Sequence, residues 1–424
     1  MRSVKNTRQR GDLRQGGVFY GWVIVAAGLV VWILEPGMYV SFGVFFKPIS
    51  SELGWTRATV SGAMSLASIA IGVLAPFSGT LSDRYGARRL VMASGAITGL
   101  AYALLSTTHS LWQFYMFYLL VGLGMGLAFA PITATVMRWF EKKRGLALGL
   151  TSLGTGIGGM FFPPLVNQLI SLWGWRATYL VLAILLGGAI LVAGSLLRSR
   201  PEDMGLLPYG AEPDEPGEAA SPAANPGRRP DFNSRQAVRT RAFWTVFLGS
   251  TAAVFSFNVI SVHLVPHATD RGLTAATAAA VMAMLGAGNS VGRLGLGALS
   301  DRVGRKRMFV VLLMATGLAM LFLTVTQSRF MFFAFALFFG MAYGGAAVTW
   351  MTLPSELFGL GAVGALTGLI MTGSTFGGAL GSFLAGYIFD VTGSYSAAFS
   401  IGAVLLLLAS GMAVFLKSPR RAIQ

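Results

Sequence analysis

The stretch GTLSDRYGARR at residues 79–89 occurs a second time, as GALSDRVGRKR at residues 297–307. Seven of the eleven positions carry the same residue in both copies. The copies stand at equivalent places in two halves of the chain, so the sequence contains an internal repeat. Such a repeat predicts two similar helical bundles that face each other across a pseudo-twofold axis.

The composition indicates that lipid surrounds much of the chain. Only 11% of the 424 residues are charged and 54% are hydrophobic, whereas a soluble domain carries about 25% charged residues. One or two soluble cores cannot hide so much apolar surface. The 55 glycines also suit close contact between helices in a bilayer. The lipid bilayer is therefore the first partner that the sequence implies.

Twelve apolar stretches are visible, and each is long enough to cross a bilayer, which takes about 20 residues. Between the sixth and the seventh lies a segment rich in Pro, Gly, Ala and charge, residues 198–240, which predicts a flexible linker. We therefore predict an all-α membrane protein whose twelve transmembrane helices form two pseudo-symmetric six-helix bundles, at residues 19–197 and 241–416. The expected spans lie near residues 19–46, 58–79, 90–108, 112–137, 145–171, 176–197, 241–267, 275–299, 308–326, 330–353, 362–389 and 395–416.

The Lys and Arg residues set the predicted orientation. If the N-terminal tail, residues 1–18, is cytoplasmic, 26 of the 32 basic residues fall in cytoplasmic segments and five fall in outer loops. Cytoplasmic loops carry an excess of basic residues, so the C-terminal tail, residues 417–424, is predicted to be cytoplasmic too. The same rule explains the net charge of +16, and we expect no nucleic-acid partner. A compact chain without long outer loops favours a bacterial inner membrane, and we expect it to function as a monomer.

The repeated loops have the features of a gate. Asp83 and Asp301 fall where a helix ends at the membrane surface, and a carboxylate there accepts hydrogen bonds from a helix N-terminus or pairs with Arg. Glycine allows a tight turn between the helices. We predict that the loops hold one conformation closed and release it; the alternative is a plain basic loop. The gating residues are Gly79, Asp83, Arg84, Gly86 and Arg88 in the first copy and Gly297, Asp301, Arg302, Gly304 and Arg305 in the second.

The pattern G-x-L-S-D-R-x-G-x-R/K-R, present twice in a chain with twelve predicted spans, resembles the major facilitator superfamily over the whole chain. The resemblance implies secondary transport by alternating access, in which two bundles rock about a central site. It does not identify a substrate, because the fold serves sugars, drugs, peptides and anions alike.

Nothing in the sequence indicates an enzyme. There is no Cys and there are only three His, which excludes thiol chemistry and leaves little to bind a metal. We expect no metal and no cofactor. The Gly runs at 149–159 and 373–381 lie within spans and lack the Lys-Ser/Thr that follows a phosphate loop. Transport must therefore be driven by gradients or by exchange. A sensor on this fold would carry a long soluble domain, which is absent.

Arg293 is the most informative residue of the predicted spans. It stands in GAGNSVGRLGLG, eight residues before Asp301, which places it about 12 Å inside the membrane from that loop. A charge at such depth is a candidate functional group, and a guanidinium matches a carboxylate with two hydrogen bonds. We predict that Arg293 binds an anion. The alternatives are a structural ion pair and a side chain that reaches back to the surface.

Arg293 also stands four residues before the Gly that opens the loop motif, and in this it resembles the monocarboxylate transporter and oxalate:formate antiporter group. In that group an Arg of span 8 binds the substrate carboxylate. Five other segments match the group: FYGW at 19–22, RWFEKKRG at 138–145, HLVP at 263–266, YGG at 343–345 and FGG at 376–378.

The sequence departs from the group at two positively charged positions and one acidic position. The oxalate carrier has a Lys where this chain has Ile370, so one positive charge and a monocarboxylate are expected here. Animal monocarboxylate carriers have an Asp where this chain has Asn289, and a Lys in span 1 that this chain lacks. Their proton pathway therefore cannot be carried over.

Glu35 is the acidic residue that lies deep in a predicted span, in ILEPG at 33–37. The following Pro and Gly predict an irregular backbone that lines the site. A carboxyl held away from water takes up a proton more readily. We expect Glu35 to carry the proton or to pair with Arg293 until substrate arrives; the alternative is a carboxyl that caps broken backbone.

Four further side chains are candidates for the binding site, together with Asn289. His263 could bind the anion or relay a proton, and a histidine hydrogen-bonded within a bundle is the alternative. Tyr39, Phe129 and Tyr343 are predicted to line the pocket, with ordinary core packing as the alternative. Phe129 aligns with a Tyr that contacts substrate in the oxalate carrier. A small apolar pocket around one Arg suits a short-chain acid.

The favoured hypothesis is a secondary transporter that moves a small organic anion, a monocarboxylate such as lactate or pyruvate, together with a proton. Two alternatives remain within transport. One is a proton-independent exchanger of organic anions, which would take a counter-anion as its second partner. The other is an exporter of an amphiphilic drug, and Arg293 weighs against a cationic one.

Overall fold

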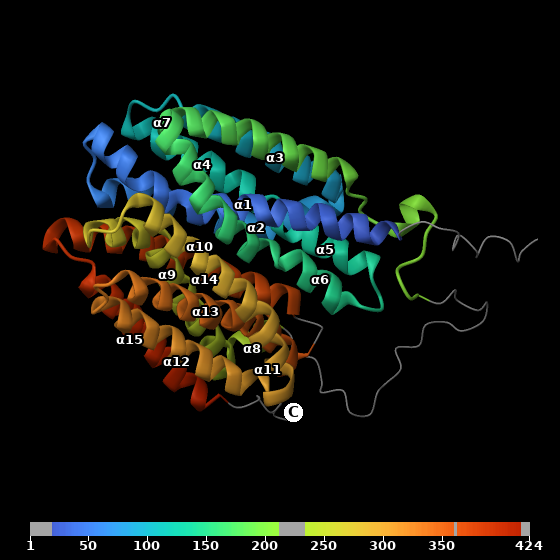
Figure 1. Cartoon of the computed structure of the whole chain (residues 1–424). Coiled ribbons are helices and arrows are strands. Elements are labelled where there is room, and N and C mark those ends of the chain that lie inside the picture. The colour runs from blue at the N-terminus through green and yellow to red at the C-terminus, as the bar shows by residue number, and fades with distance from the viewer. Residues whose placement is uncertain (1–18, 212–233, 360–362, 417–424) are drawn as a thin grey trace, which may run out of the picture.

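The computed structural model describes residues 19–211, 234–359 and 363–416, which form two helical bundles lying side by side (Figure 1). We call residues 19–211 the N half and residues 234–416 the C half. Within the described residues the regular structure is helical, apart from an isolated bridge between Phe140 and Tyr209. The end of the molecule where the first helix begins and residues 197–211 lie is the linker end, and the opposite end is the far end.

The helices follow one another along the chain with short connections. The N half contains α1 (Tyr20–Leu53), α2 (Arg57–Tyr85), α3 (Ala87–Leu105), α4 (Leu111–Gly126), α5 (Phe129–Trp139), α6 (Arg144–Ser152), α7 (Gly154–Leu196) and the 3-10 helix η1 (Pro201–Met204). The C half contains α8 (Ser234–Val238), α9 (Arg241–Asp270), α10 (Ala275–Val291), the π-helix η2 (Gly292–Leu296), α11 (Gly297–Val303), α12 (Arg305–Thr324), α13 (Arg329–Phe358), α14 (Val363–Thr392) and α15 (Ser396–Val414).

The described residues contain ten helical stretches that are long and apolar enough to cross a membrane. One of them, Arg144–Leu196, has 53 residues and would be about 80 Å long if straight, far more than a bilayer needs. It is broken at Gly174, where φ is 75° and ψ is 167°, and therefore makes two spans. With α3, whose 19 residues carry the predicted third span, this gives twelve. The predicted all-α fold with twelve transmembrane helices is confirmed.

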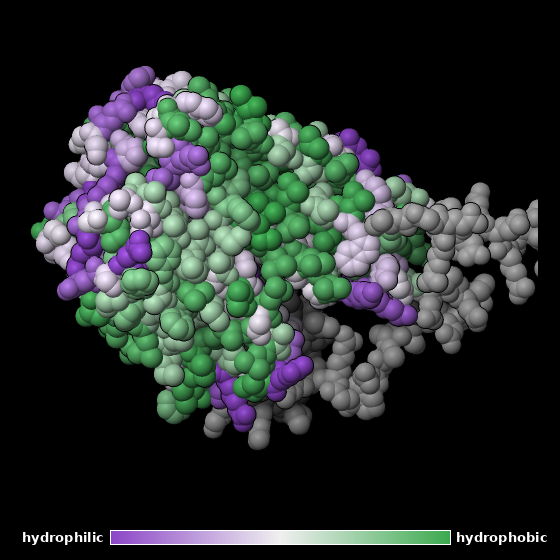
Figure 2. All heavy atoms as spheres, in the orientation of Figure 1, coloured by the Kyte–Doolittle hydropathy of each residue, from purple (hydrophilic) through white to green (hydrophobic). Residues whose placement is uncertain are grey.

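The surface has the distribution that a bilayer requires. Figure 2 shows a broad hydrophobic belt around the middle of the visible face, with hydrophilic residues gathered at the two ends. Large apolar side chains such as Ile184, Phe338 and Leu408, each within a membrane-spanning helix, are exposed. They face the hydrocarbon region, where exposure of apolar surface is favourable.

The first part of the predicted linker is packed against the N half. The N–H of Tyr209 donates to the carbonyl of Trp139 at 2.9 Å, and its ring contacts Phe19 and Trp22. The predicted linker therefore begins with a stretch in which Tyr209 contacts the N half. Residues 212–233 of the linker and both predicted tails lie outside the described residues.

The repeated loops form the tight turns that their glycines predict. Gly86 ends α2 and begins α3 with φ of 85°, and Gly304 does the same between α11 and α12 with φ of 100°. In both turns the glycine N–H donates to the carbonyl of a serine four residues earlier, Ser82 and Ser300 respectively. An L side chain is strained at such φ values, so the duplicated glycines are required by the backbone.

The helix at Glu35 is continuous, which contradicts the expectation of broken backbone there. Pro36 lies inside the unbroken helix α1. Gly37 instead serves packing, because a Cβ at this position would lie 3.0 Å from the backbone of Gly158 in α7. Two glycines facing each other let α1 and α7 approach closely. Neighbouring helices make a proline tolerable within a membrane helix.

The two halves are joined along three pairs of helices, α2 with α14, α7 with α10, and α1 with α9. Glycines allow the backbones to touch at these crossings. A Cβ on Gly286 of α10 would lie 2.3 Å from the carbonyl carbon of Gly159 in α7, and one on Gly386 of α14 would lie 2.4 Å from the hydroxyl of Ser61 in α2. The halves are therefore in direct backbone contact near the middle of the membrane and toward the far end.

Ionic contacts close the far end between the halves. Asp270 at the end of α9 pairs with Lys47 and with Arg57, each at 2.7 Å. The carboxylate of Asp390 accepts from the backbone N–H groups of Arg57 and Ala58 at 3.0 and 2.7 Å, so it caps the start of α2 from the opposite half. These contacts hold the far end shut in this conformation.

Candidate functional site between the two halves

Arg293 lies on the π-helix η2, in the middle of the eighth span. Its Nε donates to Oδ1 of Asn289 at 2.9 Å, and its side chain is half-buried. The ion pairs within the described part of the chain do not include Arg293. Single π-helical turns inside membrane or soluble helices often mark functional sites. The sequence pattern did not predict this π-helical turn.

The backbone around Arg293 is held by a close contact between the eighth and tenth spans. A Cβ on Gly292 would lie 2.1 Å from the carbonyl oxygen of Met341, and one on Gly344 of α13 would lie 2.3 Å from that of Asn289. Glycine is the residue that permits such an approach. The guanidinium is thereby presented from a rigid segment, because the backbone beneath it cannot shift without breaking this packing.

Tyr343 of α13 is the aromatic neighbour of Arg293. Its neighbour in the chain, Gly344, packs against the backbone of Asn289, one turn before Arg293. Tyr39 of α1 bonds Asn258 of α9, the residue that follows Phe257. The ring of Tyr343 stacks on Phe257 of α9 at 4.3 Å between centroids and meets Trp350 edge-on at 5.7 Å. Arg293 and Tyr343, both predicted from the sequence, are therefore brought together.

Tyr39 bridges the two halves next to this group. Its hydroxyl donates to Oδ1 of Asn258 in α9 at 2.5 Å and is 2.7 Å from the hydroxyl of Ser68 in α2. Asn258 and Ser68 were not predicted as site residues. The sequence could have indicated them, because an amide and a hydroxyl buried within apolar spans need hydrogen-bond partners.

His263 and Phe129 have neighbours other than Arg293. The ring nitrogens of His263 lie 3.1 Å from the Tyr395 hydroxyl and 2.9 Å from the Ser382 carbonyl oxygen, and the side chain is fully buried. His263 therefore sits beneath the far-end contacts, because Arg57 donates to the same Tyr395 hydroxyl. Phe129 begins α5 and stacks on Trp32 of α1 at 4.6 Å, within the N half.

Glu35 faces the third span and not Arg293. The hydroxyl of Ser94 in α3 donates to its Oε1 at 2.6 Å, and the side chain is 8% exposed. In this conformation the carboxyl belongs to the interior of the N half. Of the two roles predicted for it, the ion pair with Arg293 is not formed here.

The gating loops make ion pairs that stay within one half. Asp83 pairs with Arg138 at 2.5 Å, and Asp301 pairs with Arg305 at 3.1 Å. Both pairs are partly exposed at the linker end, where such contacts contribute about 0–1 kcal/mol. The loops therefore do not tie the halves together in this conformation, and the described ion pairs that join the halves lie at the far end. No group of three potential metal ligands occurs in the described residues.

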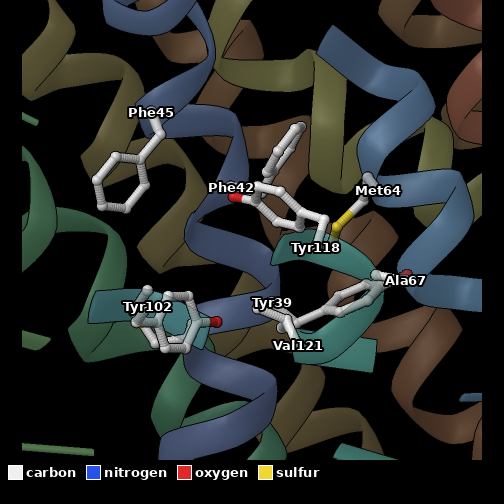
Figure 3. Close-up of a pocket in the computed structure, with 9 residues that line it drawn as sticks. Tyr39, Phe42, Phe45, Met64, Ala67, Tyr102, Tyr118 and Val121 are labelled. Carbon is white, nitrogen blue, oxygen red and sulfur yellow. The ribbon is translucent and has the colours of Figure 1, made fainter. Parts of the chain in front are cut away.

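A small cavity lies inside the N half beside Tyr39. Its volume of about 10 Å³ is close to the space that one water needs. Figure 3 shows the lining residues, with Tyr102 extending its hydroxyl end toward the other labelled side chains. The lining residues are Met38, Tyr39, Phe42, Phe45, Met64, Ala67, Tyr102, Tyr118 and Val121.

Asn289→Asp is expected to raise KM about tenfold for an anionic substrate. The new carboxylate would take the place of the amide oxygen 2.9 Å from Arg293 Nε and pair with the guanidinium, so substrate would have to displace it; a tenfold effect corresponds to about 1.4 kcal/mol. Initial rates of uptake against substrate concentration measure the change. An unaltered KM would mean that Arg293 does not meet the substrate. Asn289→Gln, which keeps an amide, is the control.

Comparison with known proteins agrees with these features. The sequence model of the Major Facilitator Superfamily matches residues 27–302 and 246–423. Human Monocarboxylate transporter 11 is 32% identical over 413 residues, with 95% of this chain and 83% of the relative covered. The Oxalate:formate antiporter of Oxalobacter formigenes is 25% identical over 400 residues, with 93% and 91% covered. The resemblance predicted from the motifs is confirmed.

A solved structure of similar fold agrees as well. A bacterial homologue of the human lysosomal transporter Spinster, in an inward-facing and occupied conformation, superposes with a TM-score of 0.71 at 16% sequence identity. The alignment covers 95% of this chain and 97% of that one.

Proposed function

The chain belongs to the Major Facilitator Superfamily and is a membrane transporter, not an enzyme, and from this premise we propose that it moves a small monocarboxylate together with a proton by alternating access. In this proposal the linker end faces the cytoplasm of a bacterial inner membrane, because the basic residues gather there. The described conformation would then be closed toward the outside.

The observation that carries the proposal is the arrangement of Arg293. A guanidinium deep in the membrane is costly unless it is paired, yet the ion pairs of the described residues leave it with the neutral amide of Asn289. A carboxylate from the substrate would supply the missing charge with two parallel hydrogen bonds. The names of the relatives, a monocarboxylate transporter and an oxalate:formate antiporter, point to the same class of ligand.

The surroundings of Arg293 favour a small acid with one carboxylate. Next to Gly344, whose backbone packs against Asn289, the ring of Tyr343 stacks on Phe257 and meets Trp350 edge-on, and such a cluster of rings suits an apolar tail. Ile370, where the oxalate carrier has a Lys, is buried and apolar. One positive charge neutralises one carboxylate, and a second carboxylate would be left without a partner.

Glu35 is the group proposed to carry the proton. It is buried within the N half and bonded to Ser94, a neutral donor. An ionised carboxylate with so little compensation is unfavourable in the membrane, so protonation at this position would accompany one conformation and release would accompany the other.

Reconstituted protein tests the proposal. Liposomes that hold the protein, with acid outside and a neutral interior, are expected to accumulate labelled lactate above its outside concentration. Glu35→Gln, which mimics the protonated side chain, is expected to lose this accumulation while it still exchanges internal for external lactate. Accumulation by Glu35→Gln equal to that of the unaltered protein would refute the role of Glu35.

A proton-independent exchange of organic anions is the second candidate. It predicts counterflow without any response to the pH gradient, in the same liposomes. Export of an amphiphilic drug, the third candidate, predicts that lactate does not compete with the drug at Arg293. The absence of accumulation combined with efficient counterflow would favour the exchanger.

A further inference from the structure

Buried hydroxyl groups follow one face of α3 from the middle of the membrane to the far end. Ser94, Thr98, Tyr102 and Ser106 stand four residues apart and are 0–7% exposed. Residues at this spacing lie above one another on a helix. The helices that pack most extensively against α3 are α7 and α4, both in the N half. The polar face is therefore turned to the interior of one half and away from the contact between the halves.

The inner end of this face is occupied by Glu35. Its Oε1 accepts the hydrogen bond of Ser94 at 2.6 Å. Two turns farther along α3, Tyr102 lines the small cavity together with Tyr39, which stands one turn after Glu35 on α1. No described ion pair involves Glu35. The carboxyl therefore touches the chain of hydroxyls directly, without a competing cation.

The middle of this face has a hydroxyl without a partner. Oγ1 of Thr98 is fully buried and has no hydrogen-bond partner, although a Thr hydroxyl in a helix can bond a carbonyl of the preceding turn. The water-sized cavity lined by Tyr39, Tyr102 and Tyr118 lies one turn farther along (Figure 3). A buried hydroxyl of this kind is normally satisfied by a water.

The outer end of this face reaches the surface at the far end. The hydroxyls of Tyr118 and Tyr179 are 2.8 Å apart beside the ring of Tyr102. Beyond Ser106, Oγ1 of Thr108 is again buried without a partner, and so is Nε of Arg176. Arg176 donates to the Thr108 carbonyl and to the exposed carboxylate of Glu52. Polar groups thus continue from Glu35 to a solvent-exposed acid.

We propose that this hydroxyl face of α3, completed by water at Thr98 and in the tyrosine-lined cavity, is the route by which protons pass between Glu35 and the far-end surface. The inference rests on the proposed proton coupling and adds to it that proton and substrate travel separately. The substrate would follow the contact between the halves, whereas the proton would pass through the interior of the N half.

Proton movement along this route needs no group other than water and hydroxyls. Each hydroxyl or water accepts one proton on one side and donates its own on the other, after which the chain reorients. The Glu35 carboxylate gains the last proton and becomes a neutral acid, and the reverse sequence releases it. Because hydroxyls both donate and accept, removing one of them interrupts the chain without removing a charge.

Two variants that remove a single hydroxyl test the route, Thr98→Val and Tyr102→Phe. Thr316→Val is the matched control, because Thr316 is buried in α12 and bonds its own helix at the Leu312 carbonyl. Tyr387→Phe is the second control, because Tyr387 is 53% exposed on the lipid-facing surface. Each protein is reconstituted and measured for lactate accumulation driven by a pH gradient and for lactate counterflow at equal pH.

The initial rate of accumulation is expected to fall about 100-fold in Thr98→Val and Tyr102→Phe, the lower end of the range for a lost proton-transfer group, with counterflow unchanged and both controls normal. Accumulation in these variants equal to that of the controls would overturn the route and leave the proposed function standing. Equal loss of accumulation and counterflow would also overturn it, because the hydroxyls would then serve the fold or the substrate. Failure of the unaltered protein to accumulate lactate, with counterflow intact, would overturn the proton coupling and this route together.

Discussion

Arg293→Ala is expected to lower kcat/KM for a monocarboxylate about 100-fold, the largest effect of any single change at the site. Loss of a desolvated guanidinium–carboxylate contact costs about 3 kcal/mol, because the substrate charge is then left without a partner in the membrane. The guanidinium has no carboxylate partner among the described ion pairs. Its removal therefore leaves no orphaned acid in the protein, and the fold should survive.

The Arg293→Lys variant distinguishes the contribution of the positive charge to substrate binding from that of the guanidinium shape. A lysine keeps the positive charge but offers a point donor in place of the planar fork, so an intermediate loss is expected. Arg329→Ala, at the start of α13 and at the far end, is the matched control for loss of one arginine. Initial uptake rates into liposomes measure the effect, and the melting temperature in detergent without substrate checks the fold. Uptake by Arg293→Ala at the unaltered rate would contradict the assignment of Arg293 as the anion site.

Gly286→Ala is expected to abolish most of the transport without any contact with the substrate. The added Cβ would lie 2.3 Å from the carbonyl carbon of Gly159 and 2.4 Å from the backbone nitrogen of Met160. These atoms belong to the backbone of α7 in the opposite half and cannot rotate away. Overpacking of this kind costs about 1–3 kcal/mol, and the cost falls on the conformation in which α7 and α10 touch.

The conformational effect of Gly286→Ala can be measured separately from transport, because the natural chain has no Cys. A cysteine in place of Ser65, whose hydroxyl bonds the Ala379 carbonyl of the opposite half at 2.7 Å, reports separation of the halves. Its labelling by a membrane-impermeant thiol reagent is expected to increase in the Gly286→Ala background. Gly188→Ala, where an added Cβ meets nothing within 4 Å, is the control and should change neither labelling nor uptake. Unchanged labelling with Gly286→Ala would mean that the crossing can absorb a methyl group.

Most of the fold followed from patterns that are local in the sequence. Twelve apolar stretches and a repeated loop are sufficient to predict two six-helix bundles, because a membrane-spanning chain has few alternatives to helices. The duplicated Gly86 and Gly304 were read correctly as turns, and both adopt positive φ. The prediction of broken backbone at Pro36 was wrong, since composition does not reveal whether tertiary contacts will hold a proline-containing helix together.

The candidate site followed from the sequence only in part. Arg293, Asn289, Tyr39 and Tyr343 were recognisable as polar or aromatic groups in apolar spans. The structure places Asn289 on Arg293, the residue after Tyr343 against the backbone of Asn289, and Tyr39 on Asn258, next to the Phe257 that stacks on Tyr343. His263 is also a polar group in an apolar span, but its ring nitrogens lie within hydrogen-bond distance of the Tyr395 hydroxyl and the Ser382 carbonyl, toward the far end. A polar residue within a span indicates that a partner exists, but the sequence does not identify that partner.

The sequence by itself determined that lipid surrounds the protein, how many spans it has, that the spans form two halves, and that one arginine lies deep in a span. These properties depend on hydrophobicity and charge along the chain. The tertiary structure alone decided that Glu35 faces Ser94 of α3 and not Arg293, that Tyr39 meets Asn258 across the halves, and that the described ion pairs between the halves lie at the far end. Those facts depend on how the helices are rotated and crossed. Rotation and crossing are fixed by glycine contacts between residues far apart in the sequence, such as Gly286 with Gly159, which a linear pattern cannot encode.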